Sequence, residues 1–299
     1  MRRAIGFRLP PGARSARLLL MAAALLFSTG GAAIKAANLP GWQIACFRSG
    51  IAAATLLAVI PAARRGWSRR TIPVAAAYAA TLILFVLANR LTTSANAIFL
   101  QATAPLYVLL FSPLLLREPI RRSDLFYIAA VGAGMSFFFT SRQSAMATAP
   151  DPALGNVLAL ASGVAYAFML LGLRWLGRRG DADSGIATVA AGNLLAFAAA
   201  LGPALPLAPF TPGDTAVLLY LGIAQIGLAY WCLTAGITRV PAFEAVTTLQ
   251  LEVAMNPVWT WLVHGERPGA RSLAGGAIIV CATVLNTWRS GTMLKKSEG

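Results

Sequence analysis

Apolar runs about as long as a lipid bilayer is thick recur along the whole chain. They begin near Leu18 and continue to Trp288, and a helix needs roughly 20 apolar residues to cross the hydrocarbon core of a membrane. Only 12% of the 299 residues are charged, whereas a soluble globular domain carries about 25%. The sequence also lacks the short segments of alternating polarity that a transmembrane β-barrel requires. We therefore predict an all-α polytopic membrane protein.

Turn-forming residues divide this apolar sequence into ten predicted transmembrane helices. The Asn-Leu-Pro-Gly stretch at 38–41 and the Pro-Gly-Asp stretch at 212–214 are examples, because proline and glycine interrupt helices. The ten predicted helices span Leu18–Ala36, Trp42–Ala62, Ile72–Ala88, Ser94–Leu116, Leu125–Thr140, Leu154–Leu176, Ile186–Leu205, Thr215–Ile237, Phe243–Val263 and Leu273–Trp288.

The basic residues predict the orientation of these helices. If both termini are cytoplasmic, 19 of the 25 lysines and arginines face the cytoplasm, as the positive-inside rule requires. The remaining six are Lys35, Arg48, Arg90, Arg142, Arg267 and Arg271. The basic N-terminus has no convincing small-residue cleavage site, so we expect a retained tail rather than a cleaved signal peptide. We predict a multi-pass protein of the inner cell membrane, surrounded by the lipid bilayer.

The two halves of the chain show a weak internal repeat. Shifts of 148 and 139 residues pair Ala97 with Ala245, Glu118 with Glu266, Leu125 with Leu273, Phe27 with Tyr166 and Lys35 with Arg174. Because each half has an odd number of predicted helices, the second half must enter the membrane in the opposite direction, which is typical of alternating-access transporters. The predicted divisions are a cytoplasmic tail (1–17), a first repeat (18–142), a linker (143–153), a second repeat (154–290) and a C-terminal tail (291–299).

Two segments resemble signatures of the drug/metabolite transporter (DMT) superfamily, EamA type. The run from Ala88 to Arg122 has an Ala-x-x-x-Thr-Thr/Ser-Ala opening, the mid-helix Pro105 and then Glu118, similar to that family's fourth helix. The run from Leu219 to Pro268 looks like the counterpart in the second half, with Glu252 followed by another glutamate.

The first two predicted helices also resemble the start of that family, with two departures elsewhere. Lys35 closes helix one and Arg48 lies early in helix two. The family's usual Glu-Pro in the second half is Glu-Val here, at 252–253, which puts the kink of helix nine in question. The usual tryptophan of helix one is Phe27, which alters the shape expected for the pocket.

The resemblance implies ten helices in two inverted five-helix EamA repeats, with a central cavity between the halves. It implies a secondary transporter, an exporter, that moves small metabolites such as amino acids or related compounds by alternating access. Import, or exchange of nucleotide-sugar or lipid-linked solutes, is the alternative within transport. The sequence contains no GxxxxGK[ST] phosphate-binding motif.

Other classes of protein fit the sequence less well. A membrane enzyme would need clustered catalytic groups, but the chain has one histidine and ten acidic residues. A non-transporting membrane sensor would have no need of inverted repeats or of polar groups in mid-membrane. We expect no cofactor and no nucleic-acid partner, because no basic stripe with interleaved aromatic residues occurs.

Glu252 is the strongest candidate for a transport residue. It lies near the middle of a predicted helix, and an ionisable group at that depth costs at least about 2.5 kcal/mol. The functional interpretation is a carboxylate that couples transport or recognises the solute. The structural interpretation is a hydrogen-bond acceptor that joins helix nine to a neighbour.

Aromatic and neutral polar side chains on nearby helix faces complete the predicted substrate site. They are Tyr78, Asn89, Gln101, Gln225, Tyr230, Trp231, Thr248 and Trp259. Small-molecule sites combine such groups with an apolar lining. The alternative is that the amides and hydroxyls join helices to one another and that the aromatic residues lie at the membrane interfaces.

Pro105 and Pro257 lie within apolar helices, where each proline removes a backbone hydrogen bond. They are candidates for gating hinges or for static bends. Lys35 and Arg48 are both expected near the outer face. There they either reach the interface through their long stems and orient the first two helices, or form a cationic vestibule for an anionic or zwitterionic solute.

The remaining features predict packing rather than chemistry. The three cysteines, Cys46, Cys232 and Cys281, lie far apart in apolar segments, so we expect three buried thiols and no metal site. His264 has no second ligand nearby in the sequence. Pairs of glycines at 132 and 134 and at 275 and 276 allow close helix contacts. We expect these contacts within a monomer, with a homodimer surface as the alternative.

Overall fold

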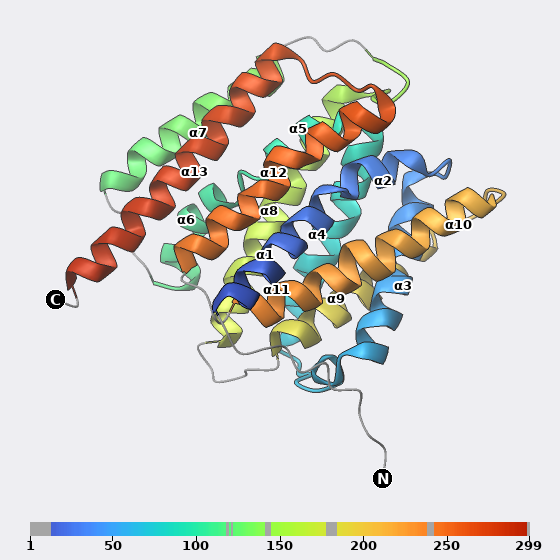
Figure 1. Ribbon diagram of the computed structural model, residues 1–299, viewed down its shortest axis with the longest axis horizontal. Helices are drawn as coiled ribbons and strands as arrows, with labels where there is room; N and C mark the ends of the chain where they lie inside the picture. The colour runs from blue at the N-terminus through green and yellow to red at the C-terminus, as the bar shows by residue number, and fades with distance from the viewer. Residues whose placement is uncertain are drawn as a thin grey trace.

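The computed structural model describes residues 13–117, 120, 122–140, 145–177, 184–237 and 242–297 (Figure 1). In that part of the chain no β-strand forms, and the structure is built from helices. These are α1 (Ala13–Ser28), α2 (Gly30–Ala36), α3 (Gly41–Val59), the 3-10 helix η1 (Pro61–Arg64), α4 (Thr71–Leu91), α5 (Ser94–Gln101), α6 (Ala104–Leu115), α7 (Arg122–Thr140), α8 (Pro152–Gly177), α9 (Ser184–Leu201), α10 (Pro212–Leu219), the π-helix η2 (Tyr220–Leu228), α11 (Ala229–Ile237), α12 (Ala242–His264) and α13 (Ala270–Ser297).

Six helical segments of the described chain are long and apolar enough to cross a bilayer. They are Ser15–Ala36, Gly41–Val59, Thr71–Leu91, Ser94–Leu115, Pro152–Leu176 and Pro212–Leu233. Shorter apolar helices run over Asp124–Thr140, Gly185–Leu201 and Ala270–Asn286. The prediction of an all-α polytopic membrane protein is confirmed, while the total of ten crossings stays a prediction. The last helix reaches Ser297, well beyond its predicted end at Trp288.

Three of the predicted helices are interrupted. Thr29 separates α1 from α2, and residues 102–103 separate α5 from α6. Pro105 lies in the first turn of α6, where a missing backbone N–H costs little because that N–H has no partner within the helix. Pro257, in contrast, lies inside the continuous helix α12. The third interruption is η2, a π-helix between α10 and α11.

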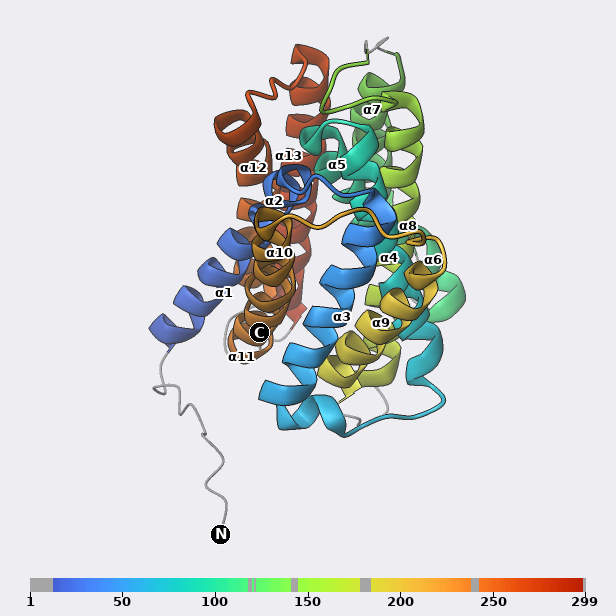
Figure 2. The same cartoon turned by 90° about the vertical axis from the view of Figure 1, so that its right-hand side faces the viewer.

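Helices from the two halves of the chain lie side by side in the bundle (Figures 1 and 2). Helix α4 of the first half packs on α8 and α9 of the second. The counterparts in sequence order pack likewise, α11 on α1 and η2 on α3. Two further pairs match a helix with its own counterpart, α3 with α9 and α7 with α13. This reciprocal pattern is what a duplicated five-helix unit predicts.

Glycine permits the closest of these contacts. A Cβ atom built on Gly275 would lie 2.6 Å from the carbonyl oxygen of Gly134, and one on Gly276 would lie 2.5 Å from the ring of Phe99. Helices α7 and α13 therefore touch backbone to backbone, as expected for packing within one chain. Gly132 has nothing within 4 Å of its Cβ position, so it takes no part in this contact.

Several helix ends are tied together at one end of the bundle. Asp214 caps α10 by accepting the Thr211 backbone N–H at 3.0 Å, and its other oxygen accepts the Asn38 N–H at 2.7 Å. The Asp151 N–H donates to the Leu91 carbonyl at 3.1 Å. The bond from Asn38 to Asp214 shows that the turn-forming stretches at 38–41 and 212–214 meet in space, although they lie far apart along the chain.

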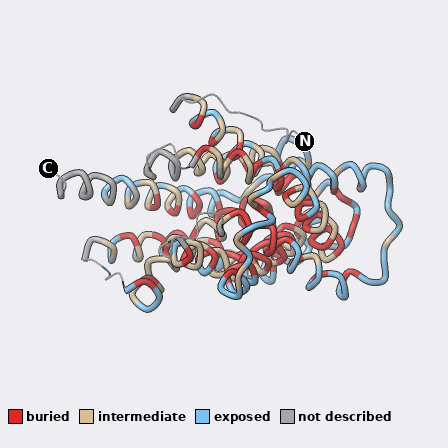
Figure 3. The backbone as a smooth tube through the Cα atoms, turned by 90° about the horizontal axis from the view of Figure 1, so that it is seen from below, coloured by how far each residue is buried: buried red, intermediate tan, exposed pale blue. Residues whose placement is uncertain are grey.

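The buried residues concentrate in the middle of the bundle (Figure 3). Cys46 and Cys232 are buried as predicted, but Cys281 is exposed. The prediction of three buried thiols is wrong for this residue. Its place in an apolar run did not distinguish a side chain facing other helices from one facing outward.

Candidate functional site

A buried ion pair joins the end of α2 to the residues just after α12. The Lys35 Nζ atom lies 3.0 Å from Glu266 Oε2, and the side chains are 3% and 1% exposed. Glu266, the repeat counterpart of Glu118, therefore pairs with a lysine from the other half of the chain. Lys35 was expected to reach the membrane interface. That prediction is wrong, because a carboxylate from the other half of the chain holds its ammonium group inside the protein.

Backbone groups complete the environment of this pair. Lys35 Nζ donates to the Thr92 carbonyl at 2.9 Å and also to the Thr148 carbonyl. The Ser94 N–H donates to Glu266 Oε1 at 2.7 Å. Beside the pair, His264 Nε2 lies 2.8 Å from the Ala32 carbonyl oxygen. Lys35 thus has a carboxylate and two carbonyl oxygens around its ammonium group, while Glu266 Oε2 has the 3.0 Å charge contact with Lys35 but no hydrogen-bond partner among the described residues. The pair joins α2 to the residues after α12.

Gly265 allows the chain to turn into this position. Its φ of +65° lies in the left-handed region, which glycine enters without steric cost. Its N–H donates to the Trp261 carbonyl at 2.9 Å. Helix α12 ends at His264, and Gly265 links that end to Glu266.

Arg48 lies in a different setting from Lys35. It is roughly 10 Å along α3 from the start of that helix, and only 3% of its surface is exposed. Its Nε and Nη1 atoms have no hydrogen-bond partner among the described residues. Arg48 thus does not reach the membrane interface, which corrects the second half of the orienting-pair prediction. Lys35 of the predicted cationic vestibule is paired with Glu266, and the part of Lys35 and Arg48 in meeting a solute stays a prediction.

Two tyrosines interact with Arg48, and a third lies beside them. Tyr78 of α4 and Tyr230 of α11 have ring centroids 5.7 Å apart and share a hydrogen bond between their hydroxyl groups. Both are close enough to Arg48 to interact with it electrostatically. Tyr166 of α8 interacts in turn with Tyr230 and with Glu252. Phenolic oxygens therefore line the region around the guanidinium group.

Glu252 is the second charge of this group. It lies near the midpoint of α12 and is half-buried. It interacts electrostatically with Arg48, and neither residue belongs to an ion pair in the described part of the chain. We call Arg48, Tyr78, Tyr166, Tyr230 and Glu252 the central cluster. Its members come from α3, α4, α8, α11 and α12, and therefore from both halves.

Residues behind the central cluster fix its tyrosines. Asn193 of α9 donates through Nδ2 to the Tyr78 hydroxyl at 3.2 Å. Phe27 of α1 packs edge-on against Tyr230, with ring centroids 5.0 Å apart. Gly192 leaves room for Tyr78, since a Cβ atom there would lie 2.4 Å from the tyrosine ring. The two hydroxyl groups are thus held in place from several sides.

Three of the predicted substrate-binding residues have structural partners instead. Asn89 is fully buried, donates to the Phe85 carbonyl at 3.0 Å and accepts from Ser94 Oγ at 2.9 Å. Gln101 donates to Ser162 Oγ at 2.7 Å. Trp259 donates through its indole N–H to Ser28 Oγ at 2.9 Å. These contacts favour the alternative in which polar side chains join helices.

Three further residues were predicted to bind substrate, namely Gln225, Trp231 and Thr248. Gln225 lies in η2, donates weakly to the Phe27 carbonyl at 3.4 Å and leaves its Oε1 without a partner. It also lies against Gly30, where a Cβ atom would be 2.8 Å from its amide nitrogen. Trp231 and Thr248 are half-buried on α11 and α12. Their part in substrate binding stays a prediction.

Sequence reasoning missed three residues of this region. Asn193 and Asn256 are buried, and both amide atoms of Asn256 lack a hydrogen-bond partner in the described chain. Tyr166 is half-buried beside Tyr230 and Glu252. The internal repeat already paired Tyr166 with Phe27 across the halves. Asn256 lies one helical turn beyond Glu252, a spacing that places both on one face.

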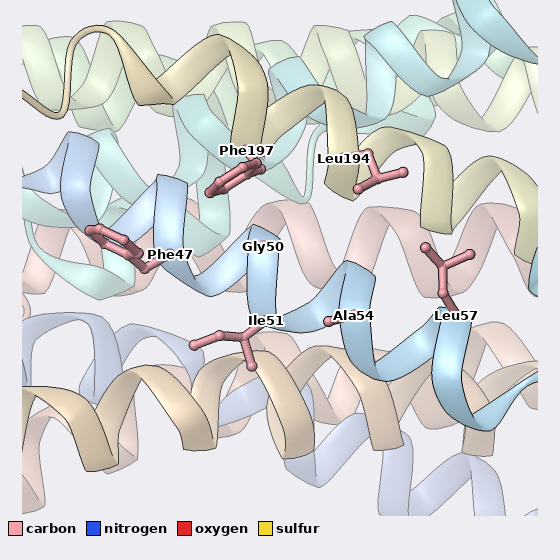
Figure 4. Close-up of a pocket in the computed structure, with 7 residues that line it drawn as sticks. All are labelled: Phe47, Gly50, Ile51, Ala54, Leu57, Leu194 and Phe197. Atoms are coloured by element: carbon pink, nitrogen blue, oxygen red, sulfur yellow. The ribbon is translucent and has the colours of Figure 1, made fainter.

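A separate groove of about 550 Å³ lies between α3 and α9 (Figure 4). Its lining is apolar and consists of Phe47, Gly50, Ile51, Ala54, Leu57, Leu194 and Phe197. It contains none of the predicted site residues and no ionisable group. The groove therefore belongs to the apolar packing of α3 on α9 and not to the central cluster.

No group of histidine, cysteine, aspartate or glutamate that could hold a metal ion occurs among the residues that the structure describes. The chemistry of the central cluster is instead that of reversible binding, with one cation, one carboxylate and several hydroxyl groups inside an apolar bundle. Helices that interleave in two related halves around such a group define a membrane transporter for small molecules.

Comparison with known proteins identifies the family. The sequence signature of the EamA-like transporter family matches residues 14–140 and again residues 153–288. The chain belongs to the EamA-like transporter family, and it is a transporter rather than an enzyme. The double match agrees with two repeats, while their boundaries at 18–142 and 154–290 stay predictions.

Two curated relatives are exporters by name. The chain is 28% identical over 285 residues to the pseudopaline exporter of Pseudomonas aeruginosa strain UCBPP-PA14, covering 91% of this chain and 95% of the relative. It is 29% identical over 209 residues to the threonine/homoserine exporter of Salmonella typhimurium strain SL1344, covering 67% of this chain and 64% of the relative. A solved crystal structure of a protein shares the fold, with a TM-score of 0.60, 20% identity, and coverage of 92% and 98%.

Proposed function

We propose that this protein exports a small polar metabolite, an amino acid or a related compound, by alternating access. The observation that carries the proposal is the central cluster. Arg48 of α3 and Glu252 near the midpoint of α12 come from different halves and interact electrostatically, without an ion pair among the described residues. Charges in the middle of membrane helices are costly and mark solute pathways.

The relatives support the direction and the class of solute. One is named for export of threonine and homoserine and the other for export of pseudopaline. Export of a polar metabolite is therefore the function that agrees with both the named relatives and the charged residues of the central cluster.

The ion pair between Lys35 and Glu266 supports alternating access. It links the two halves beyond the central cluster and is buried from solvent. We assign this end to the outer face, because the positive-inside rule places both termini in the cytoplasm. Opening of the pair would then connect the central cluster with the outside.

Flux in proteoliposomes tests the proposal. Purified protein is reconstituted, loaded with each candidate solute and compared with protein-free liposomes, starting with threonine and homoserine and with and without a pH gradient. A carrier that alternates also shows counterflow, in which unlabelled solute on one side accelerates entry of labelled solute from the other. Flux without counterflow would contradict alternating access, and absence of flux for every small metabolite would contradict the transport assignment.

A further inference from the structure

We propose that Arg48 and Glu252 bind the two opposite charges of a zwitterionic solute. The guanidinium group of Arg48 receives the carboxylate, and the carboxylate of Glu252 receives the ammonium group. This inference rests on the proposed function, because it assigns a chemistry to the same central cluster.

The unpaired guanidinium group is the first argument. Arg48 is 3% exposed, yet its Nε and Nη1 atoms have no partner in the described chain. A buried charge without its partner costs about 3 to 5 kcal/mol, whereas Lys35 in the same protein has an ion pair and two carbonyl contacts. The planar donors of arginine match a carboxylate in a bidentate arrangement. The structure therefore leaves a carboxylate receptor at this position.

Charge balance selects the zwitterion over a simple anion or cation. The central cluster contributes one positive and one negative charge, and its remaining members are tyrosines. In a low-dielectric interior, an anion bound at Arg48 would leave Glu252 facing a second negative charge. A cation bound at Glu252 would do the reverse at Arg48. A solute that carries both charges satisfies both residues and keeps the site neutral.

The tyrosines suit the groups that lie between the two charges. Tyr78 and Tyr230 share a hydrogen bond, and Asn193 donates to Tyr78, so their hydroxyl groups have fixed directions. A small polar side chain on the solute can hydrogen-bond to them. The aromatic faces can also attract an ammonium group. The variant of Glu252 described below therefore separates the contribution of its carboxylate from that of the aromatic rings.

A set of matched probes separates the two charges of the solute. Each of the twenty standard amino acids is tested for binding to the purified full-length protein in detergent. The tightest is then compared with its methyl ester, which lacks the carboxylate charge, and with its N-acetyl derivative, which lacks the ammonium charge. We expect each derivative to bind about ten- to a hundredfold more weakly, the range for hydrogen bonds to charged groups.

Two variants assign each charge to its residue. Arg48→Gln should weaken binding of the amino acid about ten- to a hundredfold while leaving the methyl ester within twofold, since the ester has no carboxylate to lose. Glu252→Gln should weaken the amino acid but leave the N-acetyl derivative unchanged. Arg48→Lys keeps the charge and loses the bidentate geometry, so it should still prefer the amino acid over its ester, at about tenfold lower affinity than the unmodified protein.

Several results would overturn the inference. They are no binding by any standard amino acid, equal binding of the ester or the N-acetyl derivative, or an equal loss for all three probes in either variant. Size-exclusion profiles and helical circular dichroism show whether the variants are folded, and Asp151→Asn is the matched acid-to-amide control on a surface residue. If another small solute shows flux and counterflow while no amino acid binds, the inference fails and the transport proposal stands.

Discussion

Two cation–carboxylate couples join the halves of this protein, and they differ in how well they are satisfied. Lys35 and Glu266 touch at 3.0 Å and are surrounded by backbone partners. Arg48 and Glu252 interact at longer range, and the Nε and Nη1 atoms of the guanidinium group lack hydrogen-bond partners in the described chain. A satisfied pair stabilises one arrangement of the halves, whereas an unsatisfied one is free to bind a solute. In the function that we propose, this difference separates a closing contact from a binding site.

The largest effect on stability is expected at the closing contact. Lys35→Met leaves the Glu266 carboxylate buried without its cation, so the free energy of unfolding should fall by about 3 to 5 kcal/mol. Adding Glu266→Gln should restore most of the loss, because the buried charge is then removed as well. Denaturant unfolding in detergent measures both. A single variant as stable as the unmodified protein would mean that the pair does not hold the halves together.

At the central cluster, loss of the cation is expected to leave the free energy of unfolding unchanged or to raise it. Arg48→Met removes a buried cation whose Nε and Nη1 atoms lack partners in the described chain, and the acid left behind, Glu252, is only half-buried, so stability should stay the same or rise by at most about 4 kcal/mol, the upper figure for replacing a whole buried pair. Arg90→Met is the matched control, because Arg90 donates to the Ala37 carbonyl at 3.1 Å and loses a real contact. That control should be destabilised by about 1 to 3 kcal/mol. Equal destabilisation of both variants would argue that Arg48 is a structural residue.

A smaller effect is expected when the tyrosines of the central cluster are displaced. Gly192→Ala places a Cβ atom 2.4 Å from the Tyr78 ring, and such overpacking costs about 1 to 3 kcal/mol. Solute flux should fall together with stability. Gly132→Ala is the control, since its Cβ position has nothing within 4 Å. A Gly192 variant with unchanged flux would show that the position of Tyr78 is not critical.

The smallest effect is expected at a structural hydrogen bond. Trp259→Phe removes the indole donor to Ser28, which should lower the free energy of unfolding by about 0.5 to 1.5 kcal/mol without changing solute affinity. Trp261→Phe, at a position 50% exposed, should be neutral. A change in solute affinity for the Trp259 variant would return this residue to the binding site.

Much of the fold follows from apolar length and turn residues, which depend on local sequence. Whether a polar side chain is buried by other helices does not follow from local sequence. Glu252, Tyr78 and Tyr230 were predicted as site residues because polar groups stand out within long apolar runs. Arg48 was assigned to the outer face from its position in the sequence, since burial by other helices cannot be read from one segment.

Partners far apart in sequence explain the remaining differences. Lys35 finds Glu266 across the whole chain, and no local pattern predicts that contact. Asn89, Gln101 and Trp259 are residue types that also line binding sites. In this protein, however, each has a hydrogen-bond partner on another part of the helical bundle. Only the packing of α4, α8 and α1 against their neighbours shows which polar side chains are already satisfied.

Outward flux in reconstituted variants shows whether the central cluster carries the solute. Glu252→Gln, the Lys35→Met/Glu266→Gln double variant and the surface control Asp151→Asn are compared at equal protein density. We expect at least a tenfold loss of flux, that is, at least about 1.4 kcal/mol, for Glu252→Gln, retained flux for the double variant once it is folded, and no change for the control. Full flux in Glu252→Gln would contradict the assignment of the central cluster as the solute site.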